Sequence, residues 1–179
     1  MKTTPSTEYA LLGALMPGPK HGYEIMQFLG AALGSAWHVG TSQLYTLLRR
    51  LEGDKFLCSK LEIQDTRPSK RIFSLTPAGK RRFLAWLKAP TEHVRDLRIE
   101  FLAKLFFFDR LSLEGGAELI EAQIQVLEQI RTRIRQRQEE EKDPFNRLVC
   151  GFKIATVEAW LQWLAKQALP FVNEVKDDG

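Results

Sequence analysis

Side chains able to read the edges of DNA bases gather at the start of one short segment of the chain. The stretch GTSQLYTLLRRLEGDKFL, residues 40–57, opens with hydroxyl and amide groups, followed by an aromatic ring and two arginines. At the N-terminal end of a helix, such groups are the donors and acceptors that meet bases and phosphates in the major groove. The residues that this pattern predicts to contact DNA are Thr41, Ser42, Gln43, Tyr45, Thr46 and Arg49.

These side chains suit different contacts. Gln43 can bond adenine through two hydrogen bonds, and the methyl group of Thr46 can meet thymine. Arg49, one turn after Tyr45, is placed for a phosphate or a guanine edge, whereas Arg50 is expected to pair with nearby acids. The alternative is an ordinary surface helix with a good cap, in which Tyr45 only covers the core. The segment by itself favours neither.

A second basic cluster favours DNA. Segments 56–63 and 70–76 alternate apolar and polar residues around a proline-containing turn, which predicts a β-hairpin with a basic tip. Such a tip can follow a phosphate backbone. The basic residues of the hairpin are Arg67, Lys70 and Arg71. Lys20 and His21 stand where a helix begins, so we expect them to hold a phosphate there, with capping by His21 as the alternative.

Charge is divided unevenly between the two halves of the chain. Residues 1–90 hold 13 lysines and arginines against 6 acidic residues, whereas residues 91–179 hold 13 against 16. A basic first half is typical of a protein that binds a polyanion, because binding releases the counterions around it. Chance spread of solvated charge is the alternative for this asymmetry.

The composition gives little support to catalysis, a cofactor or a metal site, and we expect none. Three histidines are scattered along the chain, and no glycine-rich phosphate loop of recognised spacing is present. Cys58 and Cys150 belong to no metal-binding motif, so we expect two buried free thiols. No apolar run is long enough to span a bilayer and the first residues do not resemble a signal peptide, which predicts a cytoplasmic protein without a membrane partner.

The order of the expected elements predicts a fold class. Apolar residues at helical spacing predict four helices in the first half, at about residues 4–15, 22–34, 41–53 and 76–88. With the hairpin between the third and fourth, this is the order of a winged helix-turn-helix with a two-stranded wing. We expect Thr41 or Ser42 to cap the third helix, and Thr76 to cap the fourth with Pro77 in its first turn.

After residue 89 the pattern becomes purely helical. It predicts helices at about residues 96–111, 113–141 and 144–169. We therefore expect a mainly α protein with a winged-helix DNA-binding domain at 1–89 and an all-helical dimerisation domain at 90–179.

An apolar stripe along the long helix needs a partner, which the last helix can supply through Leu148, Phe152 and Ala155. Either a self-contained bundle or a dimer arm satisfies this pattern. We favour a homodimer, because a small DNA reader usually needs two copies to address a long site. The predicted dimer contacts are Ile120, Ile124, Leu127, Ile134, Phe152, Trp160 and Trp163. A pocket for a small aromatic effector is a further interpretation of the aromatic residues, although a packed core is the commoner outcome, and it would involve Phe106, Trp160 and Trp163.

Three stretches of the chain resemble PadR-type transcriptional regulators, which are bacterial winged-helix proteins with a helical C-terminal dimerisation region. They are LLGALMPGPKHGYEI at 11–25, SQLYTLLRRLEGDKFL at 42–57 and RPSKRIFSLTPAGKRRFLAWL at 67–87. The stretch RIEFLAKLFF, with the long helix and the tryptophan-bearing helix after it, is similar to the longer-tailed branch, which includes a virulence-gene activator. Thr46 departs from the family, since many members carry a proline there. The tryptophan that lines the pocket of the short-tailed branch has no counterpart.

The resemblance implies a homodimer on a palindromic operator, with recognition helices in successive major grooves of double-stranded DNA and wings on the flanking backbone. In some members, ligands such as phenolic acids relieve binding. We therefore expect a sequence-specific transcriptional regulator that acts as a repressor. The alternative is a winged-helix module whose basic hairpin binds an acidic protein.

Overall fold

The computed structural model describes residues 5–33, 40–62 and 70–177 and divides them into two compact units. The first unit runs to Lys88 and also includes Leu102–Ser112, and the second consists of Ala89–Phe101 and the chain from Leu113 onwards. The sequence predicts a single boundary near residue 89. The return of residues 102–112 to the first unit differs from that expectation.

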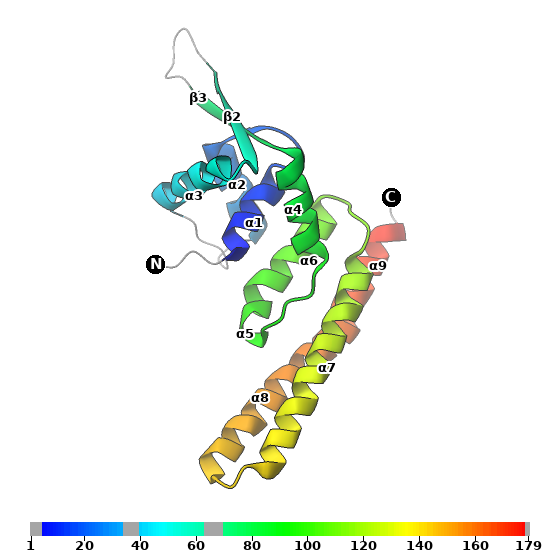
Figure 1. Cartoon of the computed structure of the whole chain (residues 1–179). Helices are drawn as coiled ribbons and strands as arrows, with labels where there is room; N and C mark the ends of the chain where they lie inside the picture. Colours follow the sequence, from blue (N-terminus) through cyan, green and yellow to red (C-terminus); the bar gives the residue numbers. More distant parts are fainter. Residues whose placement is uncertain (1–4, 34–39, 63–69, 178–179) are drawn as a thin grey trace. The chain divides into compact units, whose positions relative to one another are not determined.

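The first unit follows the predicted order of elements with one addition. Its helices and strands are α1 (Pro5–Ala14), β1 (Lys20–His21), α2 (Gly22–Leu33), α3 (Thr41–Gly53), β2 (Leu57–Glu62), β3 (Lys70–Leu75), α4 (Pro77–Lys88) and α6 (Leu102–Arg110) (Figure 1). The added element is β1, whose two residues are too few to show a readable alternation. Residue 4, expected near the start of the first helix, lies outside the described residues.

β3 is the central strand of a three-stranded antiparallel sheet, with β2 on one side and β1 on the other. The pairing of β2 with β3 extends along both strands, which confirms the predicted hairpin. On the other side Lys20 pairs with Phe73, and His21 pairs with Ile72. The wing is therefore hydrogen-bonded to the residues that lead into α2.

Aromatic packing explains why α6 belongs to the first unit. The rings of Phe83 in α4 and Phe107 in α6 meet edge to face, with centroids 5.2 Å apart. A Cβ atom on Gly13 of α1 would lie only 2.4 Å from the Phe107 ring. The absence of a side chain at Gly13 thus allows α1 to approach this pair, at the close packing typical of protein cores.

The start of α4 is capped as predicted. Thr76 Oγ1 accepts a hydrogen bond from the Gly79 backbone N–H at 3.1 Å, and Pro77 is the first helical residue. The Thr76 N–H donates to the Phe56 carbonyl at 3.1 Å, which connects α4 to the chain just before β2.

The second unit contains helices and no strand among its described residues. Its elements are α5 (Val94–Asp96), the π-helical turn η2 (Leu97–Phe101), α7 (Gly116–Glu140), α8 (Pro144–Trp163), the π-helical turn η3 (Leu164–Ala168) and α9 (Leu169–Asp177). Figure 1 shows α7 and α8 side by side as a long helical hairpin. The last helix continues beyond the predicted end at residue 169, since η3 and α9 follow α8 directly. Among the described helices, none is long and apolar enough to cross a membrane.

The face of α8 that is buried in the chain is not the one expected. Cys150 and Val157 are the buried residues of α8. Leu148, Phe152 and Ala155, expected to pack against the long helix, are exposed instead. The predicted packing of these residues inside one chain is therefore wrong, because α8 carries apolar residues on two opposite faces, whereas the dimer arm stays a prediction. Cys150 is a buried free thiol as predicted.

Cys58, also predicted to be buried, is exposed on β2. Its Sγ lies 3.8 Å from the Ser74 carbonyl of β3. The alternation of side chains along a strand gives its neighbour Leu57 the buried side.

Candidate DNA-contacting surface

Helix α3 has one face fixed in the core and the opposite face free. Its buried residues are Leu44, Leu47, Leu48 and Leu51, each at most 2% exposed. The exposed residues on the other side recur at helical spacing and are Thr41, Ser42, Tyr45, Thr46 and Arg49. Burial of the leucine stripe sets the rotation of the helix, so these polar side chains form one continuous surface.

The N-terminal cap of α3 is not the residue predicted. Gly40 is the cap residue, in an extended conformation, and no side chain of the described residues caps the first turn. The Thr41 hydroxyl instead approaches the Met26 sulfur of α2, at 3.8 Å. The predicted capping by Thr41 or Ser42 is therefore wrong, because the chain enters the helix one residue earlier. Their hydroxyl groups are not used for capping.

Two exposed side chains of α3 bond to its own backbone. The Thr46 hydroxyl donates to the Ser42 carbonyl at 2.9 Å, and Arg49 Nε donates to the Tyr45 carbonyl at 3.3 Å. The hydroxyl of Thr46 is thus engaged, while its methyl group is not. The two terminal amino groups of Arg49 have no partner among the described residues, which suits a phosphate or a guanine edge.

Gln43 and Arg50 lie at the edge of the exposed face, and Arg50 is itself exposed. They are seven residues apart, so they share a flank of the helix, and Gln43 is half-buried there. Arg50 forms an ion pair with Glu8 of α1, which confirms the expectation that it pairs with a nearby acid. The structure thus does not bring Gln43 onto the surface that carries Tyr45 and Arg49.

The ring of Tyr45 lies across the start of α2. A Cβ atom at Gly22 would be 2.7 Å from the Tyr45 hydroxyl oxygen and 2.9 Å from its ring. Only a residue without a side chain allows this approach, which gives the glycine of the sequence KHGYE a structural role. Tyr45 is 40% exposed, so it both packs on α2 and reaches the surface.

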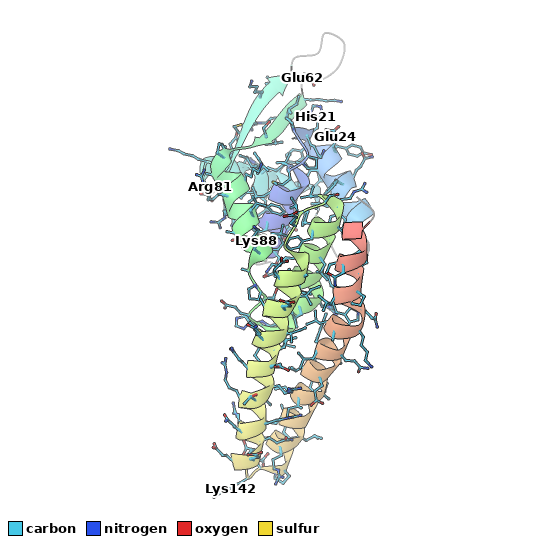
Figure 2. All side chains as sticks on the ribbon, turned by 90° about the vertical axis from the view of Figure 1, so that its right-hand side faces the viewer. His21, Glu24, Glu62, Arg81, Lys88 and Lys142 are labelled. Carbon is cyan, nitrogen blue, oxygen red and sulfur yellow. The ribbon has the colours of Figure 1, made fainter. Side chains whose placement is uncertain are left out.

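Lys20 and His21 lie at the start of α2 as expected, and Glu24 caps the same end of this helix. The His21 N–H donates to Glu24 Oε2 at 2.7 Å, and the His21 Nε2 atom is 3.6 Å from Glu62 Oε2 of the wing. Figure 2 shows His21, Glu24 and Glu62 at the same end of the first unit. A capping carboxylate already satisfies an amide that a phosphate was expected to bind. Lys20 lies over the Phe28 ring, 6.0 Å from its centroid.

The basic residues of the wing differ in their exposure and in their partners. Lys70, the first residue of β3, is exposed, and it forms no ion pair within the described part of the chain. Arg71 donates to Glu52 of α3 and to Ser59 of β2. Arg67 lies outside the described residues. Sequence reasoning had no signal for the partners of Arg71, because they come from two other elements.

The residues predicted to form the dimer contact differ in how exposed they are in the single chain. Ile120 and Leu127 are completely buried within the single chain. Phe152 is 71% exposed. The half-buried members of the set are Ile124, Ile134, Trp160 and Trp163.

The predicted effector residues belong to different units. Phe106 contacts the ring of Phe28, with centroids 6.0 Å apart, in the first unit. Trp160 and Trp163 meet edge to face at 5.6 Å in the second unit. A shallow groove beside Phe106 is lined by charged and polar residues as well as Phe28, among them Lys20, Glu24 and Arg110.

Comparison with known proteins yields two family matches. Residues 11–85 match the Transcriptional regulator PadR-like family, and residues 97–168 match the family Virulence activator alpha C-term. Negative transcriptional regulator PadR of Bacillus subtilis is 31% identical over 118 residues, covering 66% of this chain and 65% of that protein. "Probable transcriptional regulator Rv1176c" of Mycobacterium tuberculosis is 24% identical over 87 residues, covering 49% and 46%. The match thus spans less than two thirds of either relative's length.

Two crystal structures are also similar. Bacillus subtilis PadR in complex with operator DNA is 24% identical, covers 94% of this chain and 98% of that chain, and gives a TM-score of 0.47. The same protein in complex with p-coumaric acid is 22% identical, covers 96% and 99%, and gives a TM-score of 0.43.

Element order, sheet and exposed helix face define the chain as a winged helix-turn-helix protein with a helical C-terminal unit. Residues 11–85 form a domain of the PadR-like family of transcriptional regulators, and residues 97–168 form a domain of the virulence-activator C-terminal type. Both statements confirm the resemblance in the sequence.

Proposed function

We propose that this chain is a sequence-specific DNA-binding regulator of transcription that acts as a homodimer on an inverted repeat. The observation that carries the proposal is the exposed polar face of α3, which is held outward by a fully buried leucine stripe. The PadR-like domain at residues 11–85 supports transcriptional control, and 31% identity to a negative regulator favours repression. A cytoplasmic location and a non-catalytic role belong to the same proposal.

An apolar face on α8 supports the homodimer. Phe145, Leu148 and Phe152 are 69%, 69% and 71% exposed in the single chain, and they recur at helical spacing. Exposed Ala155 and Ala159 continue the row. Contiguous apolar surface of this kind marks an interface. A second copy would present the same row, as a twofold dimer requires.

A small aromatic effector stays a prediction. The residues suggested for it, Phe106, Trp160 and Trp163, lie in two units. Phe106 packs against Phe28, and Trp160 packs against Trp163. The proposal for DNA binding does not depend on an effector.

Selection from a random pool of duplexes tests the proposal. Wild-type protein should enrich an inverted repeat, bind it as a dimer, and lose affinity steeply with salt, with a log–log slope of about −0.9 for each phosphate contact. A scrambled duplex of the same composition serves as the control. Discrimination of less than about tenfold between the two duplexes would contradict the proposal and favour a protein-binding module.

A further inference from the structure

Three side chains from three elements form a closed ring of hydrogen bonds at the base of the wing. Arg71 of β3 donates from Nε to Ser59 Oγ at 2.6 Å, and from Nη2 to Glu52 Oε2 at 2.8 Å. Ser59 of β2 in turn donates to Glu52 Oε1 at 2.6 Å. Both carboxylate oxygens of Glu52 are therefore bonded within the chain, one of them to a charged donor.

The ring joins the end of the recognition helix to both strands of the wing. Glu52 is the second-to-last residue of α3. Ser59 and Arg71 are diagonal neighbours across the hairpin, since Ser59 pairs with Phe73 and Leu61 pairs with Arg71. The guanidinium of Arg71 also lies over the Phe73 ring, 5.7 Å from its centroid.

The ring is partly open to solvent. The side chains of Glu52 and Arg71 are 27% and 48% exposed. Hydrogen bonds between a guanidinium and a carboxylate are short and roughly twice as strong as neutral ones. The ring uses the Nε and Nη2 atoms of Arg71, so a phosphate bound by these two atoms would compete with the ring and lie close to the Glu52 carboxylate.

We infer that Arg71, together with Glu52 and Ser59, is a positioning residue that holds the wing at a set angle to α3, in place of the phosphate contact predicted from sequence. The inference deepens the proposed function and rests on it for its effect on DNA. Lys70 precedes Arg71 on β3 and therefore faces the other side of the sheet, where it is exposed and unpaired among described residues. Lys70 is the phosphate-contacting cation of this strand.

The positioning role has a specific consequence for recognition. Contacts to bases depend on the register of α3 in the groove, whereas general attraction to the backbone depends on charge. Loosening the wing should therefore reduce affinity for the selected duplex much more than affinity for a scrambled duplex. Loss of a phosphate contact should reduce both.

Fluorescence anisotropy over a salt series separates the two roles. The variants are Ser59→Ala, Glu52→Gln, Arg71→Gln and the double variant Glu52→Gln/Arg71→Gln, and the matched control is Lys70→Gln. The probes are the duplex that wild-type protein selects and its scrambled counterpart. The double variant keeps the net charge of wild type, so a change in its salt slope reports a lost phosphate contact.

Ser59→Ala and Glu52→Gln should each lower affinity for the selected duplex about three- to tenfold and leave the scrambled duplex within about twofold. The double variant should keep the wild-type salt slope. Its affinity for the selected duplex should be no lower than that of Arg71→Gln alone. Lys70→Gln should weaken both duplexes and make the slope shallower by about 0.9. Tighter binding by Glu52→Gln, or a shallower slope in the double variant, would overturn the inference.

Urea unfolding without DNA is an independent test of the hydrogen bonds between Glu52, Ser59 and Arg71. The effects of Glu52→Gln and Arg71→Gln on stability should be non-additive, because either change removes the ion pair between the two residues. Additive effects would overturn the inference even if DNA binding were unaffected. Failure of wild-type protein to select any duplex would instead contradict the proposed function, and the unfolding cycle would still test the ring.

Discussion

Arg49 and Arg50 are neighbours in sequence with different surroundings. Arg49 lies on the exposed face of α3, and among the described residues its one hydrogen bond is from Nε to a backbone carbonyl, whereas Arg50 forms an ion pair with Glu8 of α1. One arginine is thus available to a partner, and the other connects two helices of the first unit. The same chemical group takes two roles because the helix turns about 100° per residue.

Substitution of each arginine by glutamine should separate these roles. Arg49→Gln should weaken binding to all duplexes and make the salt slope shallower by about 0.9, because a phosphate or base contact is lost. Arg50→Gln should leave the slope unchanged and lower the free energy of unfolding by about 1 kcal/mol, since Glu8 loses its partner. Anisotropy and urea unfolding of both variants check this, and equal slopes for the two would contradict the assignment.

Gly79 should tolerate no side chain. An added Cβ atom would lie 2.1 Å from the Phe56 carbonyl oxygen, which already accepts the Thr76 N–H. Gly79→Ala should therefore lower the free energy of unfolding by about 2–3 kcal/mol, as the start of α4 must shift.

Gly53→Ala is the matched control for Gly79, because a Cβ there meets nothing within 4 Å. That change should be neutral or raise stability by up to about 1 kcal/mol, since alanine favours the helix. Urea unfolding measures both. Equal stability of the two variants would show that the chain near Phe56 relaxes freely.

At the scale of elements, a buried glutamine fixes the segment that follows α4. The Thr91 N–H donates to Gln123 Oε1 at 2.6 Å, and Gln123 Nε2 donates to the Thr91 carbonyl at 3.0 Å. Both residues are buried, at 3% and 0% exposure. The side-chain amide of Gln123 in α7 thus bonds to both backbone groups of Thr91, as buried backbone groups require.

Gln123→Ala should lower the free energy of unfolding by about 2–4 kcal/mol, because two buried backbone groups lose their bonds. Gln125→Ala, an exposed change on the same helix, is the control and should have little effect. Urea unfolding monitored by circular dichroism measures the difference. Similar stability of the two variants would mean that water replaces the lost bonds at Thr91.

At the scale of the whole molecule, the proposed dimer depends on the outward face of α8. Phe152 is 71% exposed, so the fold of one chain does not require it. Phe152→Asp should give monomers at about 10 µM protein, because a carboxylate cannot be buried in an apolar interface without a partner. The affinity of this variant for the selected inverted repeat should also be lower than that of wild type, since monomers bind the two half-sites separately.

The control for Phe152 is Gln136→Asp, which adds the same charge at an exposed position of α7. Light scattering after gel filtration measures the mass of each variant. A monomeric wild type, or a dimeric Phe152→Asp variant, would contradict the proposed interface.

The sequence determined the kind and order of the elements, because that information is local. Leucines at helical spacing predict α3, alternation predicts β2 and β3, and Thr76 followed by Pro77 predicts the start of α4. The exposed face of α3 was also predictable, apart from Gln43 on its flank.

Only the tertiary structure decided which side chains are engaged with one another. Arg71 and Glu52 are 19 residues apart, and Thr91 and Gln123 are 32 apart, so no local pattern relates them. The short strand β1 is defined by its pairing with β3. Helix α8 has two apolar faces, and the face with Cys150 and Val157 is the one buried in the chain. Periodicity shows where a residue lies on its own element, whereas its partner depends on how distant segments of the chain pack together.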